Sequence, residues 1–264
     1  MHALALLTLI PIAMWLSQTA LLLRAGLPVR LRIGSADLPQ RLKRVNRVVT
    51  YAAFSLVLLG YPLLRGQSPP AYYARFLPLG DRPLEMLHGA AAAILYLVLL
   101  YLAWTVTDNV RFEVRHRPGR LIRRLASVPL AAVFIAFIEE LLFRAMLLAD
   151  LLESFDARVA VLIGVVAFAG AHYVRSVKRY WTFPGHLALG TLLCVAFLRT
   201  GSLWLPMGLH AGGVLVLMAA RPLIRYRGPA WLVGASVFPY AGVVGILALV
   251  LLAVNVWLSY GNVS

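Results

Sequence analysis

The sequence predicts an all-α protein that crosses a membrane about eight times. Of its 264 residues, 61% are hydrophobic and 13% are charged, and the mean hydropathy is +0.82. A water-soluble domain cannot bury so many apolar side chains, whereas a bilayer covers them with lipid. The apolar residues also stand in long blocks and not in the alternation of a membrane β-barrel, which predicts helical spans.

Each predicted span is an apolar segment close to the length that a helix needs to cross the hydrocarbon layer. The eight segments are residues 3–23, 48–64, 86–106, 125–149, 159–174, 184–198, 202–220 and 237–258. The first has no basic segment before it, so we interpret it as a retained span and not as a cleavable signal. The fifth and sixth are short and require extension by flanking residues or a locally thinner bilayer.

The basic residues are unevenly divided between the loops that join these segments. Nineteen of the 25 lysines and arginines follow the first, third, fifth and seventh spans, five lie in the alternate loops, and Arg144 lies inside the fourth span. Because positive loops stay on the cytoplasmic side, both termini are predicted to lie outside the cytoplasm. The net charge of +15 is therefore assigned to membrane orientation and not to nucleic-acid binding.

Two adjacent acidic residues, Glu139 and Glu140, lie inside the fourth span. An ionisable side chain at the bilayer centre costs about 2.5–3.5 kcal/mol on insertion scales, so each one indicates function. Glu140 and Arg144 are four residues apart, share a helical face and are predicted to pair. Glu139 points about 100° away and lacks a partner on its own helix, which favours a role as general base. The alternative is a buried polar cluster that only joins helices, for which the second glutamate would be an unneeded cost.

Two histidines in later spans are possible partners of these glutamates. His172 lies near the end of the fifth span, four residues after Phe168, and His210 lies well inside the seventh span with small residues after it. Either one alone is more typical of a hydrogen-bonded interior histidine. Together with the glutamates, they predict a polar site that three helices build.

Other polar residues in or near the spans favour simpler interpretations. Glu85 and His88 have the spacing of a carboxylate–histidine metal site, but they lie at the edge of the third span, where interfacial residues are common. His186 is predicted to be interfacial, and Cys194 to be a small core residue. The sequence contains no His-Glu-x-x-His and no Gly-x-Ser-x-Gly, which argues against a zincin-type metalloprotease and a rhomboid-like serine protease.

Three motifs, in this order, resemble the CPBP (Abi) family of intramembrane proteases, the relatives of CAAX prenyl endopeptidases and of bacteriocin-processing and immunity proteins. They read Glu139-Glu140-Leu141-Leu142-Phe143-Arg144, then Phe168 to His172, then Arg199-Thr200-Gly201-Ser202-Leu203-Trp204 leading to His210. The resemblance covers residues 125–220 and implies a CAAX-prenyl-protease-like core in spans four to seven. This four-helix region would lie within a single membrane domain, residues 1–264.

The resemblance implies a glutamate-dependent endopeptidase in a bacterial inner membrane. Glu139 and His172 would activate the attacking water, His210 would stabilise the oxyanion, and Glu140 and Arg144 would orient the site. The expected substrate is a membrane-anchored or lipid-modified peptide or a C-terminal sorting signal. No cofactor is expected; if a metal such as Zn²⁺ binds, Glu139, His172 and His210 would be its ligands.

Val214 departs from the family pattern, which places Asn or Asp four residues after the histidine of the third motif. Valine cannot donate a hydrogen bond, and losing one oxyanion donor typically costs about 10²–10³ in rate. A non-catalytic membrane partner or bacteriocin-immunity protein with the protease fold therefore stays open as an alternative. A proton-coupled transporter would use Glu139, Glu140 and Arg144 as a relay, but it predicts paired repeats that the sequence does not show.

Overall fold

The computed structural model describes residues 2–29, 39–80, 82–114, 117–173, 180–234 and 238–261. The predicted all-α membrane fold is confirmed, because each predicted span coincides with a helix. These are α1 (His2–Arg24), α2 (Gln40–Leu64), α4 (Leu84–Val106), the continuous α5–η1–α6 (Pro118–Glu140, Leu141–Leu148, Ala149–Leu152), α7 (Ala157–Ala171), α8 (Phe183–Thr200), α9 (Trp204–Ala220) and α11 (Val243–Ser259). Several basic-loop residues of the orientation argument lie outside the described residues, namely Arg30, Arg32, Arg115, Arg175, Lys178 and Arg179.

Length and composition qualify five of the described helices as membrane spans, and α7, α9 and α11 are shorter apolar helices. The sixth predicted span is longer than the hydropathy pattern indicated, because α8 has 18 residues. The eighth is shorter, because the 3₁₀ turn η3 (Pro239–Ala241) precedes α11. The remaining short elements are α3 (Pro69–Ala74), η2 (Tyr180–Thr182) and α10 (Ala230–Val233).

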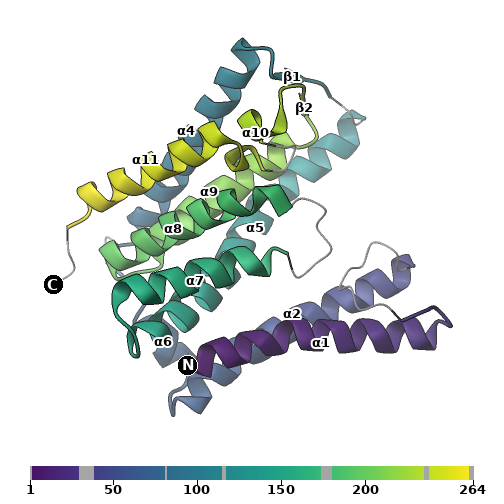
Figure 1. The fold of residues 1–264 in the computed structure, drawn as a ribbon. Coiled ribbons are helices and arrows are strands. Elements are labelled where there is room, and N and C mark those ends of the chain that lie inside the picture. The colour runs from purple at the N-terminus through teal and green to yellow at the C-terminus, as the bar shows by residue number, and fades with distance from the viewer. Residues whose placement is uncertain are drawn as a thin grey trace.

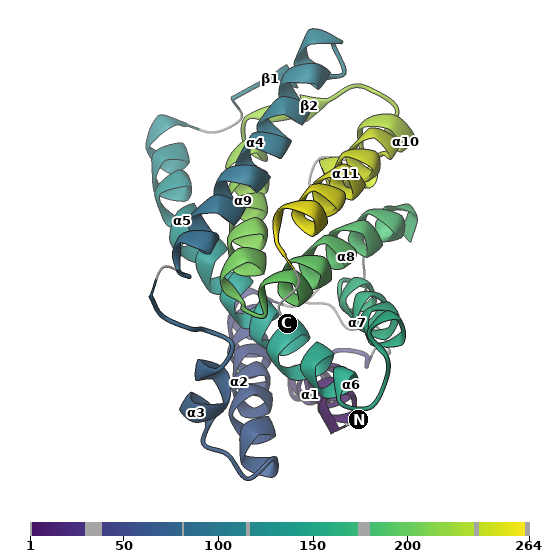
Figure 2. The ribbon, with the colours of Figure 1, turned by 90° about the vertical axis from the view of Figure 1, so that its left-hand side faces the viewer.

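The helices form a bundle with a hairpin of two helices along one side. Figures 1 and 2 show α1 and α2 lying against each other beside the bundle, with α3 next to α2. In the rest of the bundle, α4 and α5 pack against α9, while α7 and α11 pack against α8. The predicted site residues lie on α5 and η1, on α7 and at its C-terminal end, and on α9, and both α7 and α9 pack against α8.

Close packing of α4 against α9 depends on glycines that the two helices present to each other. A Cβ atom at Gly208 would overlap the carbonyl oxygen of Met86, and one at Gly212 would lie 2.5 Å from that of Ala90. A Cβ atom at Gly89 of α4 would meet the Leu205 carbonyl oxygen at 2.5 Å. The two backbones are therefore in contact, as small residues allow in membrane helices.

A buried carboxylate attaches the α1–α2 hairpin to the rest of the bundle. Asp150 in α6 is 2% exposed. The Tyr61 hydroxyl of α2 donates to its Oδ1 at 2.7 Å, and the Ala3 amide of α1 donates to its Oδ2 at 3.3 Å. Arg65 lies 3.6 Å from the same carboxylate. One aspartate thus receives donors from both helices of the hairpin.

Two short strands are present that the sequence does not predict. β1 (Val110–Phe112) and β2 (Ile224–Tyr226) pair antiparallel with Val110 opposite Tyr226. They join the chain after α4 to the chain after α9, the two helices that pack most closely. A three-residue strand lies at the lower limit of strand length and leaves almost no periodicity to detect in a sequence.

We predict that Gly208→Ala destabilises the protein, since the new methyl group would overlap the Met86 carbonyl and separate α4 from α9. Overpacking of this kind costs about 1–3 kcal/mol. The matched control is Gly213→Ala in the same helix, where a Cβ atom would meet nothing within 4 Å. Thermal unfolding of the detergent-solubilised variants measures the difference, and equal midpoints for the two would contradict this account of the α4–α9 contact.

Candidate active site

The predicted pairing of Glu140 with Arg144 is present at the centre of the bundle. Both side chains are 0% exposed, and Arg144 Nη1 donates to Glu140 Oε1 at 3.1 Å. The same oxygen lies 2.7 Å from Nδ1 of His210. Because a carboxylate only accepts, the proton of this second bond is assigned to the histidine nitrogen. Glu140 therefore joins the fourth predicted span to the seventh.

The residues that follow Glu140 form a π-helical segment, η1, whose eight side chains are all buried. A π-helical turn inside an α-helix changes the direction of the side chains after it and is frequent at functional sites. Arg144 lies in this segment. Its Nη2 is 3.4 Å from the Gly190 carbonyl oxygen, and its guanidinium lies 4.6 Å above the Phe168 ring.

Phe168 is the apolar wall against which the site packs. It is 0% exposed, and its ring centroid lies 4.8 Å from that of His172 and 6.2 Å from that of His210. A side chain at Gly190 would press on it, because a Cβ atom there would lie 3.0 Å from its Cδ1. The Phe168 ring thereby packs against both histidines and Arg144 and limits their positions.

Glu139 lies beside this network and faces a cavity. Its Oε2 is 3.7 Å from Nε2 of His210, and its side chain is 30% exposed. The same oxygen is buried and makes no hydrogen bond to any described residue. The two adjacent glutamates therefore differ in the way that the sequence predicted, with Glu140 paired to Arg144 and Glu139 directed into open space.

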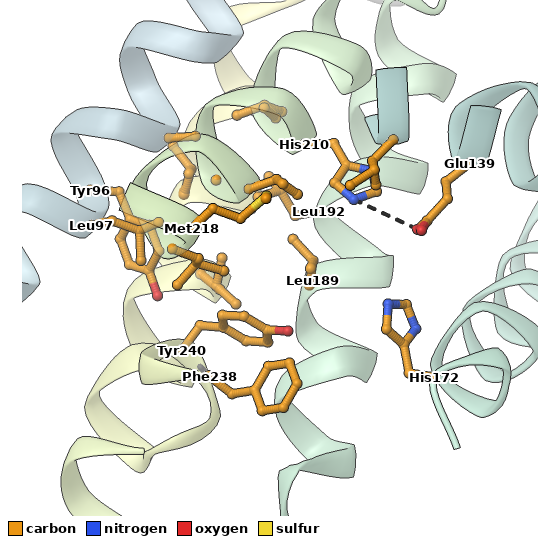
Figure 3. A pocket seen from close by; sticks show the side chains of 18 residues that line it. Tyr96, Leu97, Glu139, His172, Leu189, Leu192, His210, Met218, Phe238 and Tyr240 are labelled. Atoms are coloured by element: carbon orange, nitrogen blue, oxygen red, sulfur yellow. Dashed lines mark ion pairs between the residues drawn. The ribbon is translucent and has the colours of Figure 1, made fainter. Parts of the chain in front are cut away.

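His172 caps the C-terminal end of α7 and also faces the cavity. Its Nδ1 lies 2.9 Å from the Phe168 carbonyl oxygen. A carbonyl only accepts, so we assign the proton to Nδ1, which leaves Nε2 with a lone pair that can accept a proton. Figure 3 shows His172 and Glu139 on the same side of the cavity, with a dashed line for the ion pair between Glu139 and His210.

The cavity has a volume of about 270 Å³ and lies between α4, α5, α7, α8, α9 and the segment from Phe238 to α11. Its polar side chains among the described residues are Glu139, His172, His210, Tyr96 and Tyr240. The other lining residues are apolar, apart from Gly213, and they include Val214. One end of the cavity therefore holds acid–base groups, and the rest suits an apolar ligand.

His186 is buried inside the bundle, whereas the sequence predicts an interfacial position for it. It is 1% exposed, and its ring centroid lies 4.5 Å from that of His172. The reason is a close approach that the hydropathy pattern does not reveal. A Cβ atom at Gly185 would lie 2.7 Å from Cα of Ala241, so the start of α8 is covered by the η3 turn. The glycine beside His186 was the available signal for such contact.

Tyr240, the neighbouring residue of that turn, is a further cavity residue that the sequence analysis missed. Its position in a charge-free C-terminal segment gave no indication of a role. Glu85, by contrast, stays at the helix edge as expected, where it accepts from Arg82 Nη1 at 2.7 Å and from Ser202 Oγ at 2.9 Å.

No group of three or more His, Cys, Asp or Glu side chains among the described residues is arranged to hold a metal ion. Glu139, His172 and His210 face one cavity but do not form such a ligand set.

Comparison with known proteins supports the resemblance that the three motifs indicated. Residues 122–216 match the family model described as type II CAAX prenyl endopeptidase Rce1-like. The matched segment contains all six predicted site residues, from Glu139 to His210. No curated protein and no solved structure matches the chain. The similarity is thus to a peptidase family, over the part of the chain that builds this site.

We predict that Arg144→Met destabilises the protein, because it leaves the fully buried Glu140 without its cation. Removal of one partner from a buried ion pair costs about 3–5 kcal/mol. The double variant Glu140→Gln/Arg144→Met, which removes both charges, should recover part of the loss in unfolding midpoint. If Arg144→Met and the double variant unfold at the same temperature, the pair does not act as an electrostatic unit.

Proposed function

We propose that the protein is an intramembrane glutamate-dependent endopeptidase that cleaves a membrane-anchored or lipid-modified peptide or a C-terminal sorting signal. The observation that carries the proposal is the position of Glu139. Its carboxylate faces the cavity beside His210, while the adjacent Glu140 is bound to Arg144 and His210. The similarity to type II CAAX prenyl endopeptidases supports peptide hydrolysis as the reaction class.

In the proposed reaction, Glu139 and His172 hold a water molecule against the scissile carbonyl. Glu139 removes one proton as the water oxygen bonds to the carbonyl carbon, and the carbonyl electron pair moves to its oxygen. When the tetrahedral intermediate collapses, the C–N bond breaks and the proton passes from the Glu139 carboxyl to the leaving amine. Carboxylic acid and amine products result, with no other reactant than water.

His210 is the proposed donor to the oxyanion. Its Nδ1 is engaged by Glu140, so its Nε2 is the nitrogen that faces Glu139 and the cavity. When His210 is an imidazolium, the cluster of Glu139, Glu140, Arg144 and His210 has no net charge, as buried charges require. Such a fixed donor in a water-poor site stabilises developing negative charge strongly.

The apolar part of the cavity supports a lipid-modified or membrane-embedded substrate. The lining residues from α4, α8 and α11 include Leu97, Leu189 and Leu252, and they would cover an apolar chain while the peptide bond meets Glu139. Burial of apolar surface contributes about 25 cal/mol per Å² of surface removed from water, so this region favours substrates with an apolar group near the scissile bond.

Val214 favours the second candidate, a non-catalytic membrane partner that keeps the fold. It lies on the cavity wall and offers no hydrogen bond there. For such a protein, Glu139→Gln would leave the cellular phenotype intact, whereas for a protease the substitution would abolish it.

We predict that Glu139→Gln and His172→Ala each lower cleavage of a co-expressed substrate by about 10²–10⁴-fold, the contribution typical of general acid–base groups. Glutamine keeps the size of the side chain but cannot take a proton. Glu153→Gln is the matched control, because its carboxylate is 45% exposed and pairs with Arg65 outside the cavity. Cleavage is measured by the shift in substrate size, and undiminished cleavage by Glu139→Gln would refute the assignment.

We further propose a bacterial inner-membrane location with both termini outside the cytoplasm, from the charge distribution of the loops. Cysteine labelling tests the orientation, since Cys194 is buried. A cysteine replacing the exposed Gln67 should react with a membrane-impermeant maleimide on intact spheroplasts, and one replacing the exposed Arg120 should react only after lysis. The reverse pattern would overturn the orientation.

A further inference from the structure

Tyr240 presents a polar atom to the cavity from the side opposite α5. It belongs to the η3 turn before α11, is 6% exposed and lines the cavity. Figure 3 shows its hydroxyl directed toward the side where Glu139 and His172 lie. The hydroxyl of Tyr96, the other tyrosine of the cavity, donates instead to the Gly245 carbonyl at 2.9 Å.

His186 sets the direction of the Tyr240 hydroxyl. The Nδ1 atom of His186 lies 3.0 Å from the Thr182 carbonyl oxygen, and its Nε2 lies 3.2 Å from the Tyr240 oxygen. Nδ1 also lies 3.2 Å from the Tyr173 hydroxyl, which in turn lies 2.7 Å from Oγ1 of Thr182. Since a carbonyl oxygen only accepts, we assign the proton of His186 to Nδ1, and the Tyr173 hydroxyl then donates to Oγ1 of Thr182. Nε2 then holds a lone pair, so Tyr240 donates its hydroxyl proton to His186.

This direction decides what the Tyr240 oxygen can offer to a ligand. A phenol has one proton to donate, and His186 receives it. The lone pairs of the oxygen stay available as acceptors on the cavity side. Rotation of the proton toward a ligand would leave Nε2 of His186 buried without a partner, which is unfavourable. Toward a ligand in the cavity, the Tyr240 oxygen is therefore a hydrogen-bond acceptor and not a donor.

We propose that Tyr240 is a substrate-binding residue that accepts a hydrogen bond from a main-chain N–H of the peptide beside the scissile bond. A peptide that enters a water-poor cavity must find acceptors for its N–H groups. Among the described cavity residues, the other polar side chains are Glu139, His172 and His210, which the proposed reaction uses, and Tyr96, whose hydroxyl lies farther from Glu139 and His172 than that of Tyr240 (Figure 3). The proposal deepens the proposed function and rests on it for the identity of the ligand as a peptide.

The test measures binding of peptides that lack one N–H at a time. The probe is a fluorescent peptide with a farnesylated cysteine four residues from its C-terminus, together with a series in which single amides near that cysteine are replaced by esters. An ester removes the N–H donor and keeps the shape of the chain. Fluorescence anisotropy with the full-length, detergent-solubilised Glu139→Gln variant gives affinities without turnover.

We expect one ester position at which affinity falls about three- to tenfold, the loss that a net hydrogen bond corresponds to. Tyr240→Phe should weaken the all-amide peptide by the same factor and abolish the difference between amide and ester at that position. Tyr96→Phe is the matched control, because it removes the same hydroxyl from the same cavity and should keep that difference.

Three results would overturn the proposal. The first is that the all-amide peptide does not bind to the protein that has Tyr240. The second is that none of the ester peptides binds more weakly than the all-amide peptide. The third is that Tyr240→Phe weakens binding of every peptide equally, as the loss of a purely structural tyrosine would. Cleavage by the protein with Glu139 intact judges the proposed reaction separately. If Glu139-dependent hydrolysis is found but the amide–ester difference in affinity does not depend on Tyr240, only this inference is refuted. If that difference depends on Tyr240 but hydrolysis does not depend on Glu139, only the proposed reaction is refuted.

Discussion

The Glu140 carboxylate is the interaction on which the rest of the site depends. Its Oε1 receives Arg144 at 3.1 Å from one side and His210 at 2.7 Å from the other. A charge buried in this way is tolerated only when it is paired and hydrogen-bonded. Because Glu140 belongs to α5 and His210 to α9, this carboxylate links two helices that pack against each other.

The position of Glu139 follows from that constraint. With Glu140 directed at Arg144 and His210, the preceding residue on the helix points toward the cavity, where its Oε2 lies 3.7 Å from Nε2 of His210. His210 thus contacts both glutamates through different nitrogens. Glu140 links the helices and Glu139 faces the cavity, although both are carboxylates at consecutive positions.

Close backbone packing supports this polar centre from outside. The glycines of α4 and α9 bring these two backbones into contact, and Gly185 brings the η3 turn onto the start of α8. The first contact holds the helix that carries His210, and the second places Tyr240 beside His186. At both of these contacts a glycine leaves room for a neighbouring backbone, so the shape of the cavity depends on these glycines as well as on its lining residues.

The sequence by itself determined the helix class, the approximate places of the spans and the pairing of Glu140 with Arg144. Long apolar blocks allow only helices in a membrane, and a four-residue spacing places Glu140 and Arg144 on one face whatever surrounds them. Only the tertiary structure decided that His186 is buried and that Tyr240 faces the cavity. Both depend on contact between α8 and a turn more than fifty residues later in the chain, and hydropathy and local spacing contain no information about such distant neighbours. The sequence also does not reveal the π-helical segment after Glu140 or the three-residue strands, because neither has a hydrophobic periodicity long enough to be recognised.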